Sequence, residues 1–202
     1  TNKKNGPVKD EIKGLKEQLA KLEKEENPDA TTIEELRNGI KEAQKRLFKP
    51  IFGCEMYCAR RGKEKKSEKI DQSGWHLIVL AKNEKGYHNL IKLVSRSYVD
   101  GFYMRPRTDH EDLERFREGL IICSACIGGE LPKKIQAGDM EGALQTASWF
   151  KSIWGDDYYI ELQRHEVKNP AIRANRDIYP LQMDINRGLL EVARQLDIKI
   201  IC

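Results

Sequence analysis

The stretch EGLIICSACIGGELP, residues 118–132, combines an apolar run, a Cys-x-x-Cys pair and a double glycine, and ends on an acid and a proline. The apolar run GLIICSA predicts a strand that is buried on both faces. The glycines at 128–129 permit a tight turn, and Glu130 and Pro132 are typical of the first turn of a helix. We therefore expect a strand-to-helix junction with Cys126 at the turn.

The same alternation of strand and helix continues from residue 50 to the last residue. The predicted strands are PIFGCEMYCA (50–59), WHLIVLAK (75–82), GLIICSA (119–125), DYYIELQ (157–163) and IKIIC (198–202). The predicted helices cover residues 83–99, 128–137, 139–155 and 176–196. Apolar strands that alternate with helices predict an α/β fold with a largely parallel sheet or barrel. Functional side chains in such folds gather at the carboxyl ends of the strands.

Residues 8–48 have a different pattern, which predicts two helices joined as an antiparallel hairpin. Each helix carries one narrow apolar stripe among Lys and Glu, which is typical of helices that pack against a single partner. The stripes are Ile12, Leu15, Leu19 and Leu22, then Ile33, Leu36, Ile40, Ala43 and Leu47. Pro28 is predicted to end the first helix, and Thr32 with Glu35 to form a capping box for the second. We expect an inserted surface hairpin; the alternative is an arm that docks a partner or nucleic acid.

Composition limits the class of protein. The chain has 202 residues, 34% of them charged, and a net charge of only +4. Domains that bind nucleic acid mainly through its phosphate backbone are usually much more basic. The longest apolar runs are about five residues, far below the roughly 20 that cross a bilayer, and no secretory signal is visible. Five cysteines, an odd number, favour a reducing compartment, so we expect a cytoplasmic protein. The missing initiator Met suggests a piece of a longer chain.

Three kinds of chemistry compete for the cysteines. A thioredoxin-type redox pair needs its first thiol at the start of a helix, whereas here Cys123 falls inside the predicted strand. A structural zinc site could use Cys54 and Cys58 with the Cys-x-x-Cys pair, but cysteines in an apolar run more often behave as buried hydrophobes. The third hypothesis is a metal site assembled from strand ends. Its donors are Glu55, His76 and Cys126.

The remaining polar residues give weaker signals. A Glu inside the apolar run IFGCEMY is costly unless it is paired or binds a metal. The three other histidines, His88, His110 and His165, are interpreted as surface residues.

The loop GFYMRPRTDH, residues 101–110, combines arginines with aromatic residues, a composition suited to stacking on bases and contacting phosphates. The candidate nucleic-acid contacts are Tyr103, Arg105 and Arg107. The alternative interpretation is a loop that leads into a helix capped by Thr108 with Glu111.

Five blocks of the chain carry a family resemblance. The blocks KPIFGCEMYCA, HLIVLAKNEKGYHNLIKLVS, GFYMRPR, EGLIICSACIGGELP and YYIELQRH, in this order, resemble the polymerase-and-histidinol-phosphatase (PHP) domain of bacterial DNA polymerase III alpha subunits. The likeness covers residues 49–202, while the hairpin of residues 1–48 resembles a lineage insertion. The resemblance implies a distorted (βα)7 barrel, of which this chain holds an internal fragment.

The resemblance also implies a site. Family members hold a cluster of divalent metals, and Glu55, His76 and Cys126 match three of its ligands by position. Cys123 is then expected to pack in the strand. In the family a His-x-His and a Thr-Asp-His motif precede these ligands and an Asp-x-His follows them; in this sequence neither of the first two motifs stands before Glu55, and no Asp-x-His stands after Cys126. We therefore expect zinc, or manganese or magnesium, in the intact domain, and weak or no metal binding by this chain alone.

For function, the resemblance implies replicative DNA synthesis carried out elsewhere in a longer polymerase. The barrel itself is expected to perform metal-dependent 3′–5′ exonucleolytic proofreading. The alternatives are a non-catalytic scaffold that docks a separate proofreading subunit, and a stand-alone metal-dependent phosphoesterase. Expected partners are DNA and other replicase subunits, including a proofreading exonuclease and a sliding clamp, but no membrane. An open barrel edge also predicts self-association.

Overall fold

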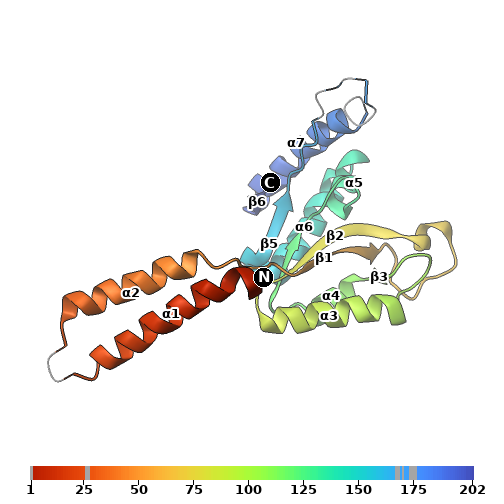
Figure 1. Ribbon diagram of the computed structural model, residues 1–202. Coiled ribbons are helices and arrows are strands. Elements are labelled where there is room, and N and C mark those ends of the chain that lie inside the picture. Colours follow the sequence, from red (N-terminus) through yellow and green to blue (C-terminus); the bar gives the residue numbers. More distant parts are fainter. Residues whose placement is uncertain (1, 26–27, 167–168, 170, 173–176) are drawn as a thin grey trace. The chain divides into compact units, whose positions relative to one another are not determined.

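A computed structural model describes residues 2–25, 28–166, 169, 171–172 and 177–202. The chain forms two compact units, Thr1–Ile51 and Phe52–Cys202 (Figure 1). Each unit has its own hydrophobic cluster, so the two are described separately. No helix among the described residues is long and apolar enough to cross a membrane.

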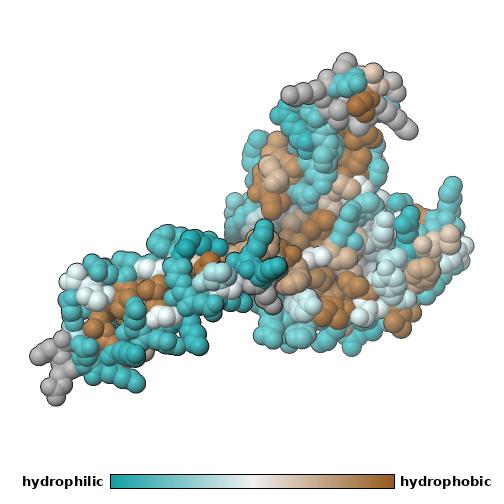
Figure 2. Space-filling view, viewed as in Figure 1, coloured by the Kyte–Doolittle hydropathy of each residue, from teal (hydrophilic) through white to brown (hydrophobic). Residues whose placement is uncertain are grey.

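The first unit is a pair of helices, α1 (Asn2–Leu22) and α2 (Ala30–Lys45). The pair is antiparallel, because Arg37 lies 2.9 Å from Glu23 near the connection and the Asn5 side chain bonds the backbone of Phe48 near the other end. The two stripes meet in a small core of Ile12, Ile40 and Ala43, flanked by Val8, Leu15, Leu19 and Leu47. Figure 2 shows these hydrophobic side chains between the helices, with hydrophilic ones outside. The helix α1 begins earlier than predicted and contains Pro7.

Both predicted threonine caps are wrong, and a neighbouring aspartate replaces each. In α2 the carboxylate of Asp29 accepts hydrogen bonds from the backbone N–H groups of Thr31 and Thr32. In α4 (His110–Arg115) the cap is Asp109 instead of Thr108. A charged carboxylate is a stronger acceptor for helix N–H groups than a hydroxyl, and it also interacts favourably with the helix dipole.

The second unit is built on one six-stranded sheet with the order β3-β1-β2-β4-β5-β6. Its strands are β1 (Gly53–Ala59), β2 (Gly74–Ala81), β3 (Arg107–Thr108), β4 (Leu120–Cys123), β5 (Tyr158–Glu161) and β6 (Lys199–Ile201). The prediction of a largely parallel sheet is wrong at the centre, because β2 is antiparallel to both β1 and β4. The outer pairs β1–β3, β4–β5 and β5–β6 are parallel. The fold is a mixed α/β sheet that stays open, with β3 and β6 at its edges.

All the long helices of this unit pack on one face of the sheet. They are α3 (Glu84–Val99), α5 (Glu130–Gln136), α6 (Met140–Trp154) and α7 (Tyr179–Leu196), beside the short α4. A single core joins them to the strands, with Leu93, Phe150 and Leu189 packing near Val79 and Ile122. The strand residues in this core alternate along each strand, as expected for a sheet covered on one side.

The other face of the sheet carries no helix of the described chain. The register places Ile78 opposite Cys123 and Leu80 opposite Ile121 on this helix-free face. Ile78, Leu80 and Ile121 are half-buried and lie outside the hydrophobic core. In Figure 1 no helix crosses β1 and β2 in this view, and Figure 2 shows hydrophobic side chains gathered over the strands. Self-association through such a face or edge stays a prediction.

Ion pairs fold the polar loop between β1 and β2 onto the body of the unit. Arg61 donates two hydrogen bonds to Asp71, whose side chain is buried, and these bonds hold the pKa of that carboxyl well below its usual value although burial opposes them. The ammonium of Lys63 lies 3.1 Å from the carboxylates of both Asp109 and Asp112. The antiparallel hairpin of β1 and β2 is therefore tied to the start of α4.

Deleting residues 1–47 should leave the second unit folded, because the two hydrophobic clusters share no residue. We expect the remaining chain to keep its strand signal in circular dichroism and a cooperative melt. As a control, Leu93→Ala in the second core should cost about 2–5 kcal/mol of stability. Loss of the melt on deletion of residues 1–47 would show that the hairpin belongs to the core.

Candidate metal centre

Three segments far apart in the sequence bring donor atoms together. Glu55 lies on β1, His76 on β2 and Cys126 in the turn that follows β4. The Nδ1 atom of His76 lies 2.7 Å from Oε1 of Glu55 and 3.3 Å from Sγ of Cys126. One ligand atom from each residue falls within 4.8 Å of the other two. The three residues that the sequence singled out thus form one cluster.

The register of β1 and β2 explains why Glu55 and His76 meet. Tyr57 lies directly opposite His76, and side chains two residues apart on a strand share a face, so Glu55 and His76 are diagonal neighbours. Both project from the helix-free face. The side chain of Glu55 is 56% exposed and is paired with His76, so its carboxylate avoids the cost of an unpaired acid in an apolar strand. Its neighbours Cys54 and Met56 point to the helix-covered face instead.

A strained turn returns Cys126 to the sheet. Ala125 has a φ of 62°, in the left-handed region that a non-glycine residue adopts at a cost of about 1–3 kcal/mol. The carbonyl of Gly128 accepts a hydrogen bond from the backbone N–H of His76 at 3.0 Å. A Cβ on Gly128 would come within 3.0 Å of the His76 ring, and the N–H of Gly128 lies 3.4 Å from Sγ of Cys126. Glycine is needed here because the backbone passes directly against the imidazole.

The geometry fits a metal site better than a nucleophilic triad. In a Cys-His-Glu triad the thiol and the carboxylate contact opposite nitrogens of the ring, so that the ring can relay a proton. Here Glu55 and Cys126 both approach Nδ1 of His76. Donor atoms around a tetrahedral zinc ion are separated by about 3.3–3.8 Å, given bonds of about 2.0–2.3 Å. The 3.3 Å between His76 and Cys126 matches this separation, while Glu55 and His76, at 2.7 Å, are paired directly with each other. A carboxylate, an imidazole and a cysteine sulfur are all donor types that zinc accepts.

The other cysteines do not join this cluster. Cys54 and Cys58 lie on the helix-covered face, so the sheet separates them from Cys126 and the four-cysteine zinc hypothesis is wrong. Burial raises the pKa of Cys58 well above its usual value. Burial, together with the charge of Glu161, raises the pKa of Cys123 to about 11. Cys123 is therefore a packed thiol, in agreement with its predicted role in the strand.

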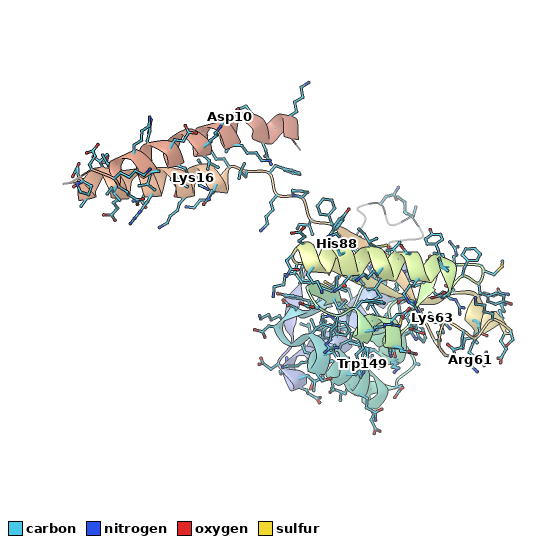
Figure 3. The ribbon with its side chains drawn as sticks, turned by 90° about the horizontal axis from the view of Figure 1, so that it is seen from below. Asp10, Lys16, Arg61, Lys63, His88 and Trp149 are labelled. Atoms are coloured by element: carbon cyan, nitrogen blue, oxygen red, sulfur yellow. The ribbon has the colours of Figure 1, made fainter. Side chains whose placement is uncertain are left out.

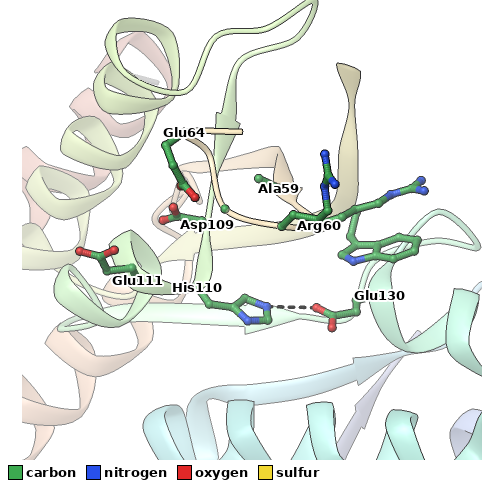
Figure 4. A pocket seen from close by; sticks show the side chains of 10 residues that line it. Ala59, Arg60, Glu64, Asp109, His110, Glu111 and Glu130 are labelled. Carbon is green, nitrogen blue, oxygen red and sulfur yellow. Dashed lines mark hydrogen bonds and ion pairs between the residues drawn. The ribbon is translucent and has the colours of Figure 1, made fainter. Parts of the chain in front are cut away.

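A second polar group lies on the opposite face of the sheet and was missed from the sequence. Nε2 of His110 lies 3.0 Å from Oε2 of Glu130, in a pocket of about 270 Å³ (Figure 4). The imidazole stacks on Trp149 at 4.3 Å, and the other carboxylate oxygen of Glu130 contacts Lys134 and Thr146. Burial opposes ionisation of Glu130, but His110 and Lys134 hold its pKa below the usual value. His110 is therefore not a simple surface residue.

The other two histidines match the prediction that they lie at the surface. His88 is exposed on α3 (Figure 3), and His165 is exposed after β5. Trp149, labelled in the same view, lies on α6. The one sequence signal that sets His110 apart from His88 and His165 is its position: it is the first residue of a helix, directly after the capping residue Asp109.

The predicted nucleic-acid contacts are only partly available. The side chain of Arg107 is fully buried, and its guanidinium donates to the carbonyls of Gly101 and Lys63. Arg107 is therefore a structural residue, and its assignment as a nucleic-acid contact is wrong. Tyr103 is half-buried beneath that guanidinium, at 5.9 Å. Arg105 is exposed and lies over the ring of Tyr57, which joins it to the helix-free face.

Comparison with known proteins agrees with this arrangement. A sequence model described as the PHP domain matches residues 26–165. The chain belongs to the PHP domain family. The match to the PHP domain includes all three donors of the cluster; it begins before α2 instead of at residue 49 and ends before α7.

Relatives of this PHP domain include subunits of DNA polymerases. The chain is 45% identical over 161 residues to the DNA polymerase III subunit alpha of Borreliella burgdorferi, covering 79% of this chain and 13% of that protein. It is 36% identical to the subunit of Aquifex aeolicus, covering 76% of this chain and 13% of the relative. The chain thus spans about 13% of the length of these curated relatives.

Zinc should protect Cys126 from alkylation in the folded chain. At pH 8 we expect iodoacetamide to modify the exposed Cys202 and the half-buried Cys126, but not the buried Cys58 or Cys123. Zinc in excess, as needed for an ion that the chain alone is expected to bind weakly, should slow modification of Cys126 and leave Cys202 unchanged, because a metal-bound thiolate is a poor nucleophile. Mass spectrometry of the peptides measures each site. Equal rates at Cys126 with and without zinc would remove this thiol from the cluster.

Proposed function

We propose that this PHP domain binds a divalent cation through Glu55, His76 and Cys126, within a DNA polymerase III alpha subunit whose 3′–5′ proofreading it carries out. The observation that supports the proposal is the convergence of three different donor atoms within 4.8 Å. The relatives from Borreliella burgdorferi and Aquifex aeolicus, both named DNA polymerase III subunit alpha, supply the context of DNA synthesis. In this proposal, polymerisation itself takes place in other parts of the longer protein.

The donor set favours zinc over magnesium. Magnesium prefers oxygen ligands alone, whereas a thiolate and an imidazole suit zinc, with manganese as the alternative for a site that also has a carboxylate. Three protein donors are also the number found in catalytic zinc sites. When bound, such a cation acts as a Lewis acid that polarises a phosphoryl oxygen and neutralises charge in phosphodiester hydrolysis.

The residues of the chain hold the donors in place. Tyr57 packs edge-on against the His76 ring, with centroids 5.1 Å apart, and the backbone of Gly128 lies against the same ring. The N–H of Gly128 donates to Sγ of Cys126 at 3.4 Å and so helps to fix the position of the sulfur. Such supporting contacts fix the orientation of metal ligands and raise metal affinity. The helix-free face leaves the cluster open to a substrate.

The metal site is tested by comparing two cysteines that lie three residues apart. Cys126→Ser should weaken cobalt or zinc binding by on the order of 100-fold or more. Residues that only hydrogen-bond to a metal ligand typically contribute about 10- to 100-fold in affinity, and a ligand itself contributes more. Cys123→Ser is the matched control and should leave affinity unchanged. Titration with cobalt, followed by its thiolate charge-transfer absorption, measures both. Equal losses from the two variants would assign the metal to the Cys-x-x-Cys pair.

Hydrolysis is tested in two proteins. We expect the 202-residue chain alone to shorten a 5′-labelled single-stranded oligonucleotide no faster than buffer with metal, because it supplies three ligands of a larger family cluster. In the full-length alpha subunit, Cys126→Ser should abolish exonuclease activity and leave polymerisation intact. A full-length protein that binds metal at this site but never shortens DNA would favour the scaffold that docks a separate proofreading subunit.

A further inference from the structure

A pocket with no assigned role opens beside the metal cluster. It has a volume of about 310 Å³ and lies between β1, the last turns of α3 and the loop before β3. Its lining residues are Cys54, Glu55, Met56, Tyr57, Val94, Ser97, Tyr98, Arg105 and Pro106. Glu55 belongs both to this pocket and to the metal cluster. A ligand in the pocket therefore lies next to Glu55, one of the three donors.

Aromatic contacts lead from the cluster into the pocket. The rings of His76 and Tyr57 pack edge-on, and the guanidinium of Arg105 lies 5.7 Å from the centroid of the Tyr57 ring. Farther out, the rings of Tyr98 and Phe102 stack with centroids 6.5 Å apart and an interplanar angle of 22°. The lining of the pocket thus includes two aromatic residues, Tyr57 and Tyr98, and one cation, Arg105.

These groups are available to a ligand. Tyr98 is 60% exposed and Phe102 50% exposed, which is a high exposure for two adjacent aromatic rings. Within the described ranges Arg105 forms no ion pair, unlike Arg61 and Arg96, which both bind aspartates. The charge of Arg105 is therefore not neutralised by the protein, and it can pair with an anion from solution.

We propose that this pocket is the subsite for the terminal nucleoside of single-stranded DNA, with its base stacked on the exposed ring of Tyr98 and with Arg105 on a phosphate. The proposal rests on the proposed function, since it places the scissile end of the strand at Glu55. A base offers a flat π-surface to aromatic walls, and arginine contacts phosphates and stacks on bases. The volume also falls in the range of small-ligand pockets, about 300–1,000 Å³.

A nucleic-acid strand fits these groups better than a peptide. A peptide added to the edge of β1 would be recognised by backbone hydrogen bonds and apolar side-chain pockets, and would make no use of an unpaired guanidinium. Stacking walls with one cation are the combination found in proteins that bind single strands with little sequence preference. The small net charge of +4 does not oppose this, because the site is local and needs no basic surface.

The test measures binding of a short fluorescent oligothymidylate to the full chain by anisotropy, in EDTA, so that metal binding does not contribute. Tyr98→Leu and Arg105→Gln should each weaken binding about 5- to 30-fold, the cost of losing one stacked base or charged contact. Tyr98→Phe keeps the ring and should bind like the unmodified chain. Arg194→Gln removes the same charge from α7, outside the pocket, and should have little effect.

A second oligonucleotide identifies the base. The unmodified chain should bind the same strand with an abasic 3′ end more weakly than the intact strand. Tyr98→Leu should bind the two strands equally, because that variant has lost the ring on which the base stacks. Thymidine monophosphate should compete if the pocket takes the terminal nucleotide alone. Identical binding of both strands by every variant would overturn the subsite, even with metal binding at Cys126 intact. If the unmodified chain distinguishes the two strands but the cluster of Glu55, His76 and Cys126 binds no metal, the subsite stands and the proposed function is overturned instead.

Discussion

The antiparallel pairing of β1 with β2 is the constraint on which the site depends. Its register sets Tyr57 opposite His76, and thereby makes Glu55 a diagonal neighbour of the imidazole on the helix-free face. A shift of one residue would turn Glu55 toward the hydrophobic core and Met56 toward solvent. Core packing by Met56 and Cys58 therefore fixes the register, and the same packing places the metal donors.

Periodicity predicted the existence and type of most elements, because each buries one stripe or one face. It could not predict the direction of β2 relative to β1. A loop of this length suits either a hairpin or a crossover, and what selects the hairpin is a set of contacts distant in sequence. Lys63 in this loop reaches Asp109, 46 residues farther along the chain, and Asp112. Charged residues in a polar loop look the same in the sequence whether they are solvated or buried.

The candidate site could be identified from the sequence only in part. The residues alone left redox, four-cysteine and mixed-donor chemistry open, and the family resemblance selected Glu55, His76 and Cys126. Geometry adds the reason: Cys126 shares a face with the other two donors, and Cys54 and Cys58 do not. Arg107 was misjudged because a buried arginine that bonds carbonyls has the same sequence context as an exposed one.

The turn after β4 links the two faces of the sheet. Ser124 at its start is buried, donates its backbone N–H to Tyr159 and accepts from the N–H of Glu161, so β5 holds this end of the turn. At the other end Gly129 packs so closely on the carbonyl of Ser124 that a Cβ would lie 2.2 Å from it. These anchors compensate for the strained backbone of Ala125. The strain directs the thiol of Cys126 to the open face, while the next helix begins on the covered one. A strained backbone persists only where the contacts around it hold it in place. The position of the Cys126 thiol is therefore set by the sheet that anchors both ends of the turn, and not by the turn alone.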